Sequence, residues 1–102
     1  MIRGGVYWVE LETEGRRPVC VLTRSAAIDH LRDVVVAPIT TRIRGIASEV
    51  ALGADDGMPR DCAISLDNLR TVPKSLLVAQ ITQLGPERMR EVCRALSASV
   101  GC

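Results

Sequence analysis

The fold of this chain is decided by residues 34–39, which read Val-Val-Val-Ala-Pro-Ile. A short apolar run bounded by polar residues is typical of a strand that is buried on both faces. Branched side chains favour extended backbone because they pack well on a pleated surface. Pro38 has no N–H group, so the end of this strand is expected at a sheet edge or a bulge. The run therefore predicts a central strand in a β-rich domain.

Apolar segments on both sides of this run predict further strands. Residues 6–11 alternate between two faces, and residues 18–23 form a second apolar run that begins at a proline. The polar residues 12–16 between them predict a turn. Downstream strands are expected at residues 48–52, 62–66, 69–72 and 80–84. Residues 62–66 and 69–72 form either two short strands or one interrupted strand.

The spacing of apolar residues becomes helical after residue 84. Pro86 suits the first turn of a helix because a missing N–H costs nothing there, and Gly101 suits its end. A short helix is also expected over residues 25–31, capped by Ser25, and one helical turn within residues 73–78. The apolar positions that recur at helical spacing in the last segment are Met89, Val92, Cys93, Leu96 and Val100.

Length and composition predict one small α+β domain that spans residues 1–102. Of the residues, 47% are apolar, so the chain can bury a core. Short strands followed by one helix are most simply buried by a twisted, antiparallel, barrel-like sheet that carries the helix. No leader and no apolar run of membrane length is present, which predicts a cytoplasmic protein that does not insert in a membrane.

The four cysteines and the single histidine exclude several kinds of site. No cysteines form a Cys-x-x-Cys pair, and His30 is not at metal-binding spacing from a cysteine. A mechanism with two histidines is impossible within one subunit, and no glycine-rich phosphate loop occurs. We therefore expect no metal and no cofactor. Cys20 and Cys93 fall at apolar positions and are expected to be buried free thiols, whereas Cys102 is expected to be exposed.

Two polar side chains lie at the ends of apolar strands, where rigid backbone can hold them in place. Arg17 precedes the strand expected at residues 18–23, and Thr40 follows residues 34–39. The guanidinium offers a fixed fork of donors that suits a phosphate, and the hydroxyl adds one small polar group. The pair can stabilise charge on phosphoryl oxygens while a ribose 2′-hydroxyl supplies the nucleophile. Because arginine is effectively always protonated, the sequence does not identify a general base.

Clusters of arginine predict a local phosphate-binding face, although the net charge is only +1. Clustered arginines can bind phosphates locally without a high overall charge. Asp67 and Asn68 either read base edges or form a structural turn. Trp8 either stacks on a base or belongs to the core or to a dimer interface. The candidate RNA-binding residues are Arg16, Thr41, Arg42, Arg44, Asp67 and Asn68.

Six segments occur in order along nearly the whole chain. They are Arg17-Pro18-Val19, Ile39-Thr40, residues 42–44, Arg60-Asp61-Cys62, Asn68-Leu69-Arg70-Thr71 and residues 86–100. Together they resemble the MazF/PemK family of toxin endoribonucleases. The resemblance implies a small SH3-like β-barrel with a C-terminal helix, the MazF/CcdB-like toxin fold, assembled as a homodimer.

The resemblance also implies an activity. It is a metal-independent endoribonuclease of a toxin–antitoxin module, which cuts single-stranded RNA at a short sequence and leaves a 2′,3′-cyclic phosphate and a 5′-hydroxyl. Arg17 would act on the scissile phosphate and in proton transfer, and Thr40 would stabilise the transition state. A flexible segment of a MazE-like antitoxin would block the RNA groove. The first loop is shorter than is common in the family, and Glu12 or Glu14 could replace the usual glutamate.

Two other functional classes stay open. A toxin of the same fold could inhibit a topoisomerase by protein contact without nuclease activity, and then Arg17 would be dispensable and the terminal helix critical. A non-catalytic SH3-like binding module is the second class. Such modules usually present an aromatic groove, and the two aromatic residues of this chain, Tyr7 and Trp8, argue against it.

Overall fold

The computed structural model describes all residues, 1–102, and contains seven strands that precede a long C-terminal helix. The predicted α+β class is confirmed. The strands are β1 (Gly5–Leu11), β2 (Gly15–Val21), β3 (Asp33–Thr40), β4 (Glu49–Leu52), β5 (Cys62–Ser65), β6 (Arg70–Pro73) and β7 (Leu77–Gln83). The helices are α1 (Ser25–Ile28), the 3₁₀ turns η1 (Ala54–Asp56) and η2 (Lys74–Leu76), and α2 (Pro86–Val100).

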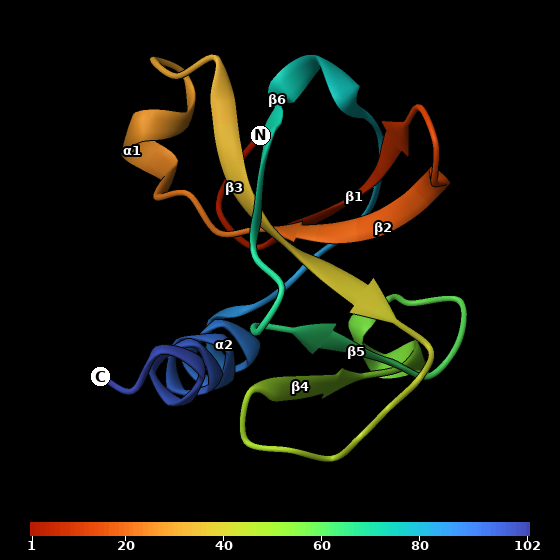
Figure 1. Cartoon of the computed structure of the whole chain (residues 1–102), viewed down its shortest axis with the longest axis vertical. Coiled ribbons are helices and arrows are strands. Elements are labelled where there is room, and N and C mark those ends of the chain that lie inside the picture. Colours follow the sequence, from red (N-terminus) through yellow and green to blue (C-terminus); the bar gives the residue numbers. More distant parts are fainter.

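The seven strands form one antiparallel sheet in the order β4-β5-β3-β2-β1-β7, and β6 adds to β3. Figure 1 shows the strong twist of this sheet, with β4, β5 and α2 on one side of the β1–β2 hairpin and β6 on the other. The end strands β4 and β7 do not pair with each other. The sheet is therefore open, and the closed barrel expected from the sequence is not confirmed.

The central strand β3 is bordered by different strands along its length. One edge pairs with β2. The other edge pairs with β6 from Asp33 to Val36 and with β5 at Ile39 and Thr40. Pro38 lies between these two ladders, at a place where neither β5 nor β6 pairs with β3. Of the edge or bulge expected from the sequence, the structure has a locally unpaired edge of β3 at Pro38, where a residue without N–H loses no ladder hydrogen bond.

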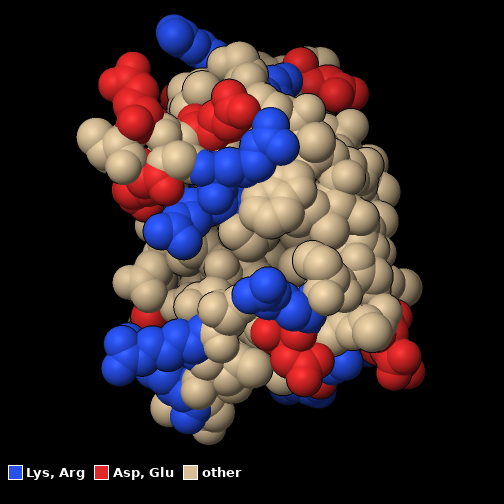
Figure 2. All heavy atoms as spheres, turned by 90° about the vertical axis from the view of Figure 1, so that its right-hand side faces the viewer, with Lys and Arg blue, Asp and Glu red and all other residues tan.

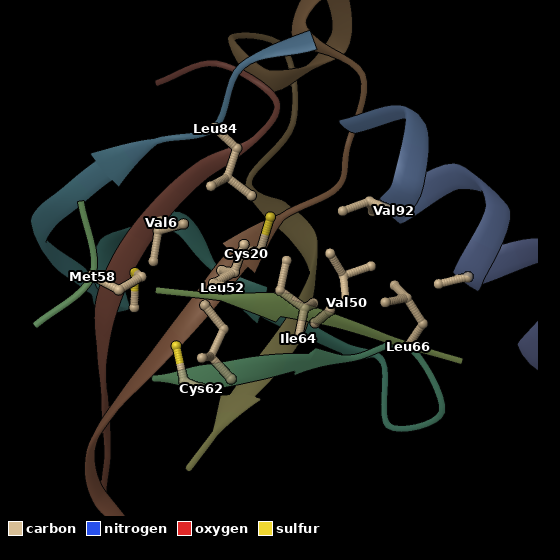
Figure 3. Packing of buried hydrophobic residues seen from close by; sticks show 13 residues of the cluster. Val6, Cys20, Val50, Leu52, Met58, Cys62, Ile64, Leu66, Leu84 and Val92 are labelled. Carbon is tan, nitrogen blue, oxygen red and sulfur yellow. The ribbon is translucent and has the colours of Figure 1, made fainter. Parts of the chain in front are cut away.

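Apolar side chains form two clusters on opposite faces of the sheet. In β2, Val19 and Val21 belong to one cluster, whereas Cys20 between them belongs to the other, as alternation along a strand requires. The larger cluster lies under α2, and Figure 3 shows Val92 extending from that helix toward Val50. Its 13 buried members are Val6, Cys20, Ala37, Ile39, Val50, Leu52, Met58, Cys62, Ile64, Leu66, Leu84, Val92 and Ala95.

Helix α2 has the predicted bounds. Pro86 occupies its first turn, and Gly101 ends it with a left-handed φ of 77°. The prediction that Cys93 is buried is wrong. Cys93 is exposed beside the buried Val92, and its sulfur accepts a hydrogen bond from Nη2 of Arg3 at 3.1 Å. Neither α1 nor α2 has the length and apolar content that a membrane-spanning helix requires.

The other predicted cysteine environments are confirmed. Cys20 is fully buried, and burial raises the pKa of its thiol to about 12. Cys102 is exposed. Cys62 is also buried, and burial raises the pKa of its thiol above the ordinary value.

Several element ends differ from the sequence predictions. The turn covers residues 12–14 rather than 12–16, because Gly15 adopts a left-handed φ of 74° and begins β2. Arg16 therefore lies in a strand. The helix predicted over residues 25–31 ends at Ile28, and Ser25 does not cap it. Instead, the Ser25 hydroxyl accepts a hydrogen bond from the backbone N–H of Arg3 at 2.9 Å.

Candidate active site

The candidate site forms where β2 and β3 move apart. The last registered pair between these strands is Val19 opposite Pro38. Two residues further on, the same register would place Arg17 opposite Thr40, on one face of the sheet. Beyond Val19, however, β2 continues only with β1, and Thr40 pairs with Ala63 of β5. The divergence opens a gap between the strands with an arginine on one side and a threonine on the other.

Arg17 and Thr40 line two hollows that meet at this gap. The larger hollow, of about 430 Å³, lies on the face that carries Trp8. The smaller, of about 230 Å³, lies on the face that carries Val9 and Val19. The remaining lining residues of the larger hollow are Arg16, Pro18, Ile39, Thr41, Met58, Pro59, Arg60, Cys62 and Ile81. Those of the smaller one include Leu11, Glu14, Val36, Pro38, Arg70 and Val72.

Arginines around the two hollows differ in whether a carboxylate neutralises them. Arg16 forms an ion pair with Glu10 across the β1–β2 ladder at 3.0 Å. Arg70 forms one with Glu14, also at 3.0 Å. Arg17 makes no ion pair and no side-chain hydrogen bond, although it lies between these pairs. Its guanidinium donors are therefore free to bind an anion that enters the gap.

The Thr40 hydroxyl is oriented by its own loop. Its Oγ1 atom accepts a hydrogen bond from the backbone N–H of Arg42 at 3.0 Å, which is the turn contact that the sequence allowed as a purely structural role. A hydroxyl that accepts in this way retains its own hydrogen for donation. The turn and a binding role are thus compatible, because the turn fixes the oxygen and leaves the donor available.

The structure separates the two glutamates that the sequence left as alternatives. Glu14 lines the smaller hollow together with Arg17 and Thr40. Glu12, the first residue of the three-residue turn, lines neither hollow. His30 is exposed near α1 and also lines neither hollow. No group of three or more histidine, cysteine or acidic residues is placed to hold a metal ion.

A family model described as PemK-like, MazF-like toxin of type II toxin-antitoxin system matches residues 2–100. The chain belongs to this toxin family. It is 48% identical over 101 residues to the probable endoribonuclease MazF5 of Mycobacterium tuberculosis. The match covers 98% of this chain and 93% of that protein. The family resemblance predicted from the sequence is confirmed.

Solved structures of MazF toxins share the fold. The M. tuberculosis toxin MazF-mt6 has a TM-score of 0.88 at 34% identity, over 95% of this chain and 96% of that chain. An endoribonuclease from Mycobacterial species, solved in complex with its cognate antitoxin, has a TM-score of 0.89 at 30% identity. That match covers 99% of this chain and 95% of the solved one. These neighbours identify the open, seven-stranded sheet with its terminal helix as the MazF-like fold.

Only part of the predicted RNA-binding set gathers at the hollows of this MazF-like toxin. Arg16 and Thr41 line the larger hollow with Arg17 and Thr40. Arg42 and Arg44 line neither hollow and lie on the exposed loop after β3. The Glu49 carboxylate holds that loop, because it accepts hydrogen bonds from the backbone N–H groups of Arg44 and Gly45 at 2.9 and 3.1 Å.

Asp67 and Asn68 lie away from the hollows, in the turn between β5 and β6. Asp67 accepts a hydrogen bond from the Ser48 hydroxyl, and Asn68 donates one to the Ser65 hydroxyl at 2.9 Å. Neither residue lines either hollow. The contact of Asn68 lies within the turn, and that of Asp67 ties the turn to the segment before β4, so both residues fit the structural role that the sequence left open as an alternative.

The structure adds two arginines that the sequence did not single out for the site. Arg60 and Arg70 line the larger and the smaller hollow, respectively. Trp8, for which the sequence left base stacking open, is half-buried and lines the larger hollow. Figure 2 shows the side at the right of Figure 1, where cationic groups lie above and below an uncharged surface. Arg60 and Arg70 occur in segments that carry the family resemblance, but nothing in their own spacing predicted that they face the gap.

Proposed function

We propose that this chain is the toxin of a type II toxin–antitoxin pair and a metal-independent endoribonuclease that cuts single-stranded RNA at a specific sequence. The 2′-hydroxyl of a ribose attacks the adjacent phosphorus, and the products carry a 2′,3′-cyclic phosphate and a 5′-hydroxyl. One observation carries the proposal. Arg17, without a carboxylate partner, stands across a gap from Thr40 where two hollows meet.

Arg17 and Thr40 act on the scissile phosphate. The guanidinium donates hydrogen bonds to the non-bridging oxygens, whose negative charge grows as the 2′-oxygen attacks. The Thr40 hydroxyl donates a further hydrogen bond, because its oxygen is already held by the N–H of Arg42. Both donors are mounted on strands that pair elsewhere with the sheet, so they need little reorganisation during the reaction.

Glu14 is the carboxylate that accepts the proton of the 2′-hydroxyl. It is the acidic residue that shares the smaller hollow with Arg17 and Thr40. A proton acceptor must reach the reacting group, so geometry favours Glu14 over Glu12 and His30, which line neither hollow. Arg70 holds the Glu14 side chain in place, since its Nη1 atom contacts both carboxylate oxygens, at 3.0 and 3.2 Å.

The larger hollow binds the nucleotides next to the cut. Trp8 offers an aromatic face on which a base can stack, and Arg16 and Thr41 add polar contacts. Arg42 and Arg44 extend the cationic surface along the exposed loop and bind the RNA backbone outside the hollows. For Asp67 and Asn68 we retain no role in base reading, because they line neither hollow and their side chains bind the hydroxyls of Ser48 and Ser65, respectively.

The partners of this toxin are single-stranded RNA, a second copy of the chain and a MazE-like antitoxin. Complex formation with a cognate antitoxin is described for a Mycobacterial relative of the same fold. An antitoxin segment that covers the gap between Arg17 and Thr40 would block cleavage directly. The alternative of a toxin that inhibits a topoisomerase receives no support from the comparisons, in which the relatives are named endoribonucleases.

Incubation with a long unstructured RNA in excess chelator tests the proposal. Wild-type protein should produce fragments with cyclic-phosphate ends, Arg17→Ala should produce almost none, and Thr40→Ala should produce them about tenfold more slowly. Equal cleavage by all three proteins would remove Arg17 and Thr40 from the mechanism while retaining the activity. No cleavage of several RNAs by the wild type would reject the ribonuclease assignment.

A further inference from the structure

The loop of residues 53–61, which we call the Arg60 loop, brings a second unpaired arginine to the larger hollow. Arg60 is exposed, forms no ion pair and lines the hollow together with Arg17. The two arginines come from different parts of the fold, since Arg17 belongs to β2 and Arg60 to a loop before β5. Uncompensated guanidiniums that line one hollow suit a ligand with several negative charges.

The Arg60 loop is fixed by one carboxylate with several contacts. Oδ1 of Asp56 accepts a hydrogen bond from Nε of Arg88 at 2.8 Å, and Oδ2 accepts one from the N–H of Gly53 at 3.0 Å. The Asp56 side chain is only 10% exposed, and the hydrogen bond from Arg88 holds the pKa of its carboxyl below the ordinary value. Arg88 also contacts Glu91 through Nη1 at 2.8 Å. Asp56 thus ties the loop to α2.

Two further contacts hold the same loop against the sheet. The Thr82 hydroxyl of β7 donates a hydrogen bond to the backbone oxygen of Asp56 at 2.9 Å. Gly57 has a φ of 84°, and a Cβ atom at this position would lie 2.5 Å from Oγ1 of Thr82. Only glycine permits this approach. Met58 then enters the larger cluster, where it is 6% exposed.

These contacts fix the position of the Arg60 backbone. Its backbone lies two residues after the buried Met58, and the intervening Pro59 has a restricted φ. The guanidinium itself has no partner that holds it away from the hollow. The site therefore has an unpaired cationic side chain whose backbone is held by the loop contacts. Because the backbone is already ordered, less conformational entropy is lost when the side chain binds a ligand.

We propose that Arg60 binds a phosphate next to the scissile one, and that the Asp56–Arg88 contact is a positioning device that holds Arg60 at the hollow. This inference rests on the ribonuclease function proposed above and extends it by naming a second phosphate contact. Arg17 acts on the phosphate that is cut, whereas Arg60 contributes binding along the strand. Asp56 and Arg88 act only through the loop.

RNA binding by Arg60→Ala tests the phosphate contact. The probe is a short single-stranded RNA with 2′-deoxyribose at the mapped cut site, so that binding is measured without cleavage. We expect affinity to fall about tenfold, the effect of losing one charge-assisted hydrogen bond. The slope of log affinity against log salt should fall by about 0.7, as expected for one contact to a single strand. Arg94→Ala removes an exposed, unpaired arginine outside the hollow and should leave both quantities unchanged.

A double-mutant cycle tests the positioning role. Asp56→Ala should weaken binding about threefold, and Asp56→Ala combined with Arg60→Ala should be no weaker than Arg60→Ala alone. KM should rise in each variant with kcat nearly unchanged. Arg88→Lys, which can restore a contact to Asp56, should bind RNA better than Arg88→Ala. Glu91→Gln leaves the contact between Arg88 and Asp56 in place and should bind as the wild type does.

Each outcome bears on a separate claim. Unchanged affinity and salt slope in Arg60→Ala, with normal cleavage by the wild type, would overturn the inference and leave the ribonuclease proposal standing. If the losses of RNA affinity caused by Asp56→Ala and Arg60→Ala multiply in the double variant, Asp56 does not act through Arg60 and its positioning role is overturned. Thermal unfolding of every variant identifies any that fail to fold. If the Asp56 or Arg88 variants do not fold, Arg60→Ala still tests the phosphate contact, because the Arg60 side chain makes no ion pair that stabilises the fold. A wild type that neither binds nor cuts RNA would reject both proposals.

Discussion

The two arginine-rich regions of this toxin differ in how their charges are compensated. At the start of α2, Arg88 contacts Asp56 and Glu91, each at 2.8 Å. At the gap between β2 and β3, Arg17 has no acidic partner although Glu10 and Glu14 lie on the same hairpin. Those two glutamates are occupied by other arginines. The difference teaches that Arg88 is committed to contacts that hold the fold together, whereas Arg17 keeps its donors free for a ligand although two paired arginines, Arg16 and Arg70, line the same hollows.

Arg17→Ala should cause the largest loss of activity with little loss of stability. Loss of a donor aimed at developing negative charge is expected to lower kcat/KM about 100- to 1,000-fold. The melting temperature should change by less than about 4 °C, because the exposed side chain makes no contact that stabilises the fold. Cleavage assays and calorimetry on the same sample measure both. A large fall in melting temperature would show that Arg17 is structural after all.

Thr40→Ala tests the other side of the gap. Removal of one neutral hydrogen-bond donor should lower kcat/KM about tenfold, which corresponds to about 1.4 kcal/mol. Thr40→Ser keeps the hydroxyl and should recover most of the activity, whereas Thr40→Val keeps the shape and should not. Activity in Thr40→Val equal to that of the wild type would reduce Thr40 to a turn residue.

Arg88→Ala tests the compensated region. Loss of the contacts to Asp56 and Glu91 should lower stability by about 1 kcal/mol, or roughly 5 °C in melting temperature, while any cleavage defect should appear in KM. Thermal unfolding at neutral pH measures the change. An effect on kcat as large as that of Arg17→Ala would break the distinction between the two regions.

The same contact gives the stability a defined pH dependence. Because the hydrogen bond from Arg88 lowers the pKa of Asp56 below its ordinary value of 3.8, the folded carboxyl binds its proton less readily than the unfolded one. Its contribution is therefore complete above pH 3.8 and is lost as pH falls through the lower, folded pKa. The stability difference between wild type and Arg88→Ala should shrink over that acidic range. A difference that stays constant would mean that Asp56 is not the partner that matters.

Arg16→Ala should give the smallest effect. Arg16 is the neighbour of Arg17 in sequence but points to the opposite face and is neutralised by Glu10 at 3.0 Å. We expect kcat/KM to fall by less than about threefold, since an exposed ion pair already screens the charge. Arg16→Ala and Arg17→Ala each remove one positive charge from adjacent positions. A difference in kcat/KM between the two variants therefore reports the position of the charge rather than its loss. An Arg16→Ala defect equal to that of Arg17→Ala would show that total charge, rather than the gap, governs activity.

The strands and α2 were predictable because their signals are local. The apolar run at residues 34–39 and the helical spacing after residue 84 each fall within one element. Arg17 and Thr40 were candidates because the sequence predicted each of them beside the end of a strand; Thr40 does end β3, whereas Arg17 lies inside β2. Their relative position was not predictable from periodicity, because it depends on the pairing of β2 with β3 and on where that pairing stops.

The errors have physical causes of the same kind. Arg60 lies in a loop without periodicity, and only the anchors of Asp56 and Met58 bring it to the hollow. Cys93 matched the helical stripe but lies at its edge, where Arg3 reaches it. Ser25 has the composition of a cap, yet its hydroxyl is taken by the backbone of Arg3. In each case a partner distant in sequence determined the outcome.

The pairing of the first strand with the last also governs when activity can arise during synthesis. β1 lies between β2 and β7, so the sheet that supports the β1–β2 hairpin is complete only when Leu77–Gln83 has been made. A chain still being translated, or one released early from a stalled ribosome, lacks this strand and the helix after it. Such fragments should be unfolded by circular dichroism and inactive on RNA. The topology thus leaves the sheet incomplete until β7 has been synthesised.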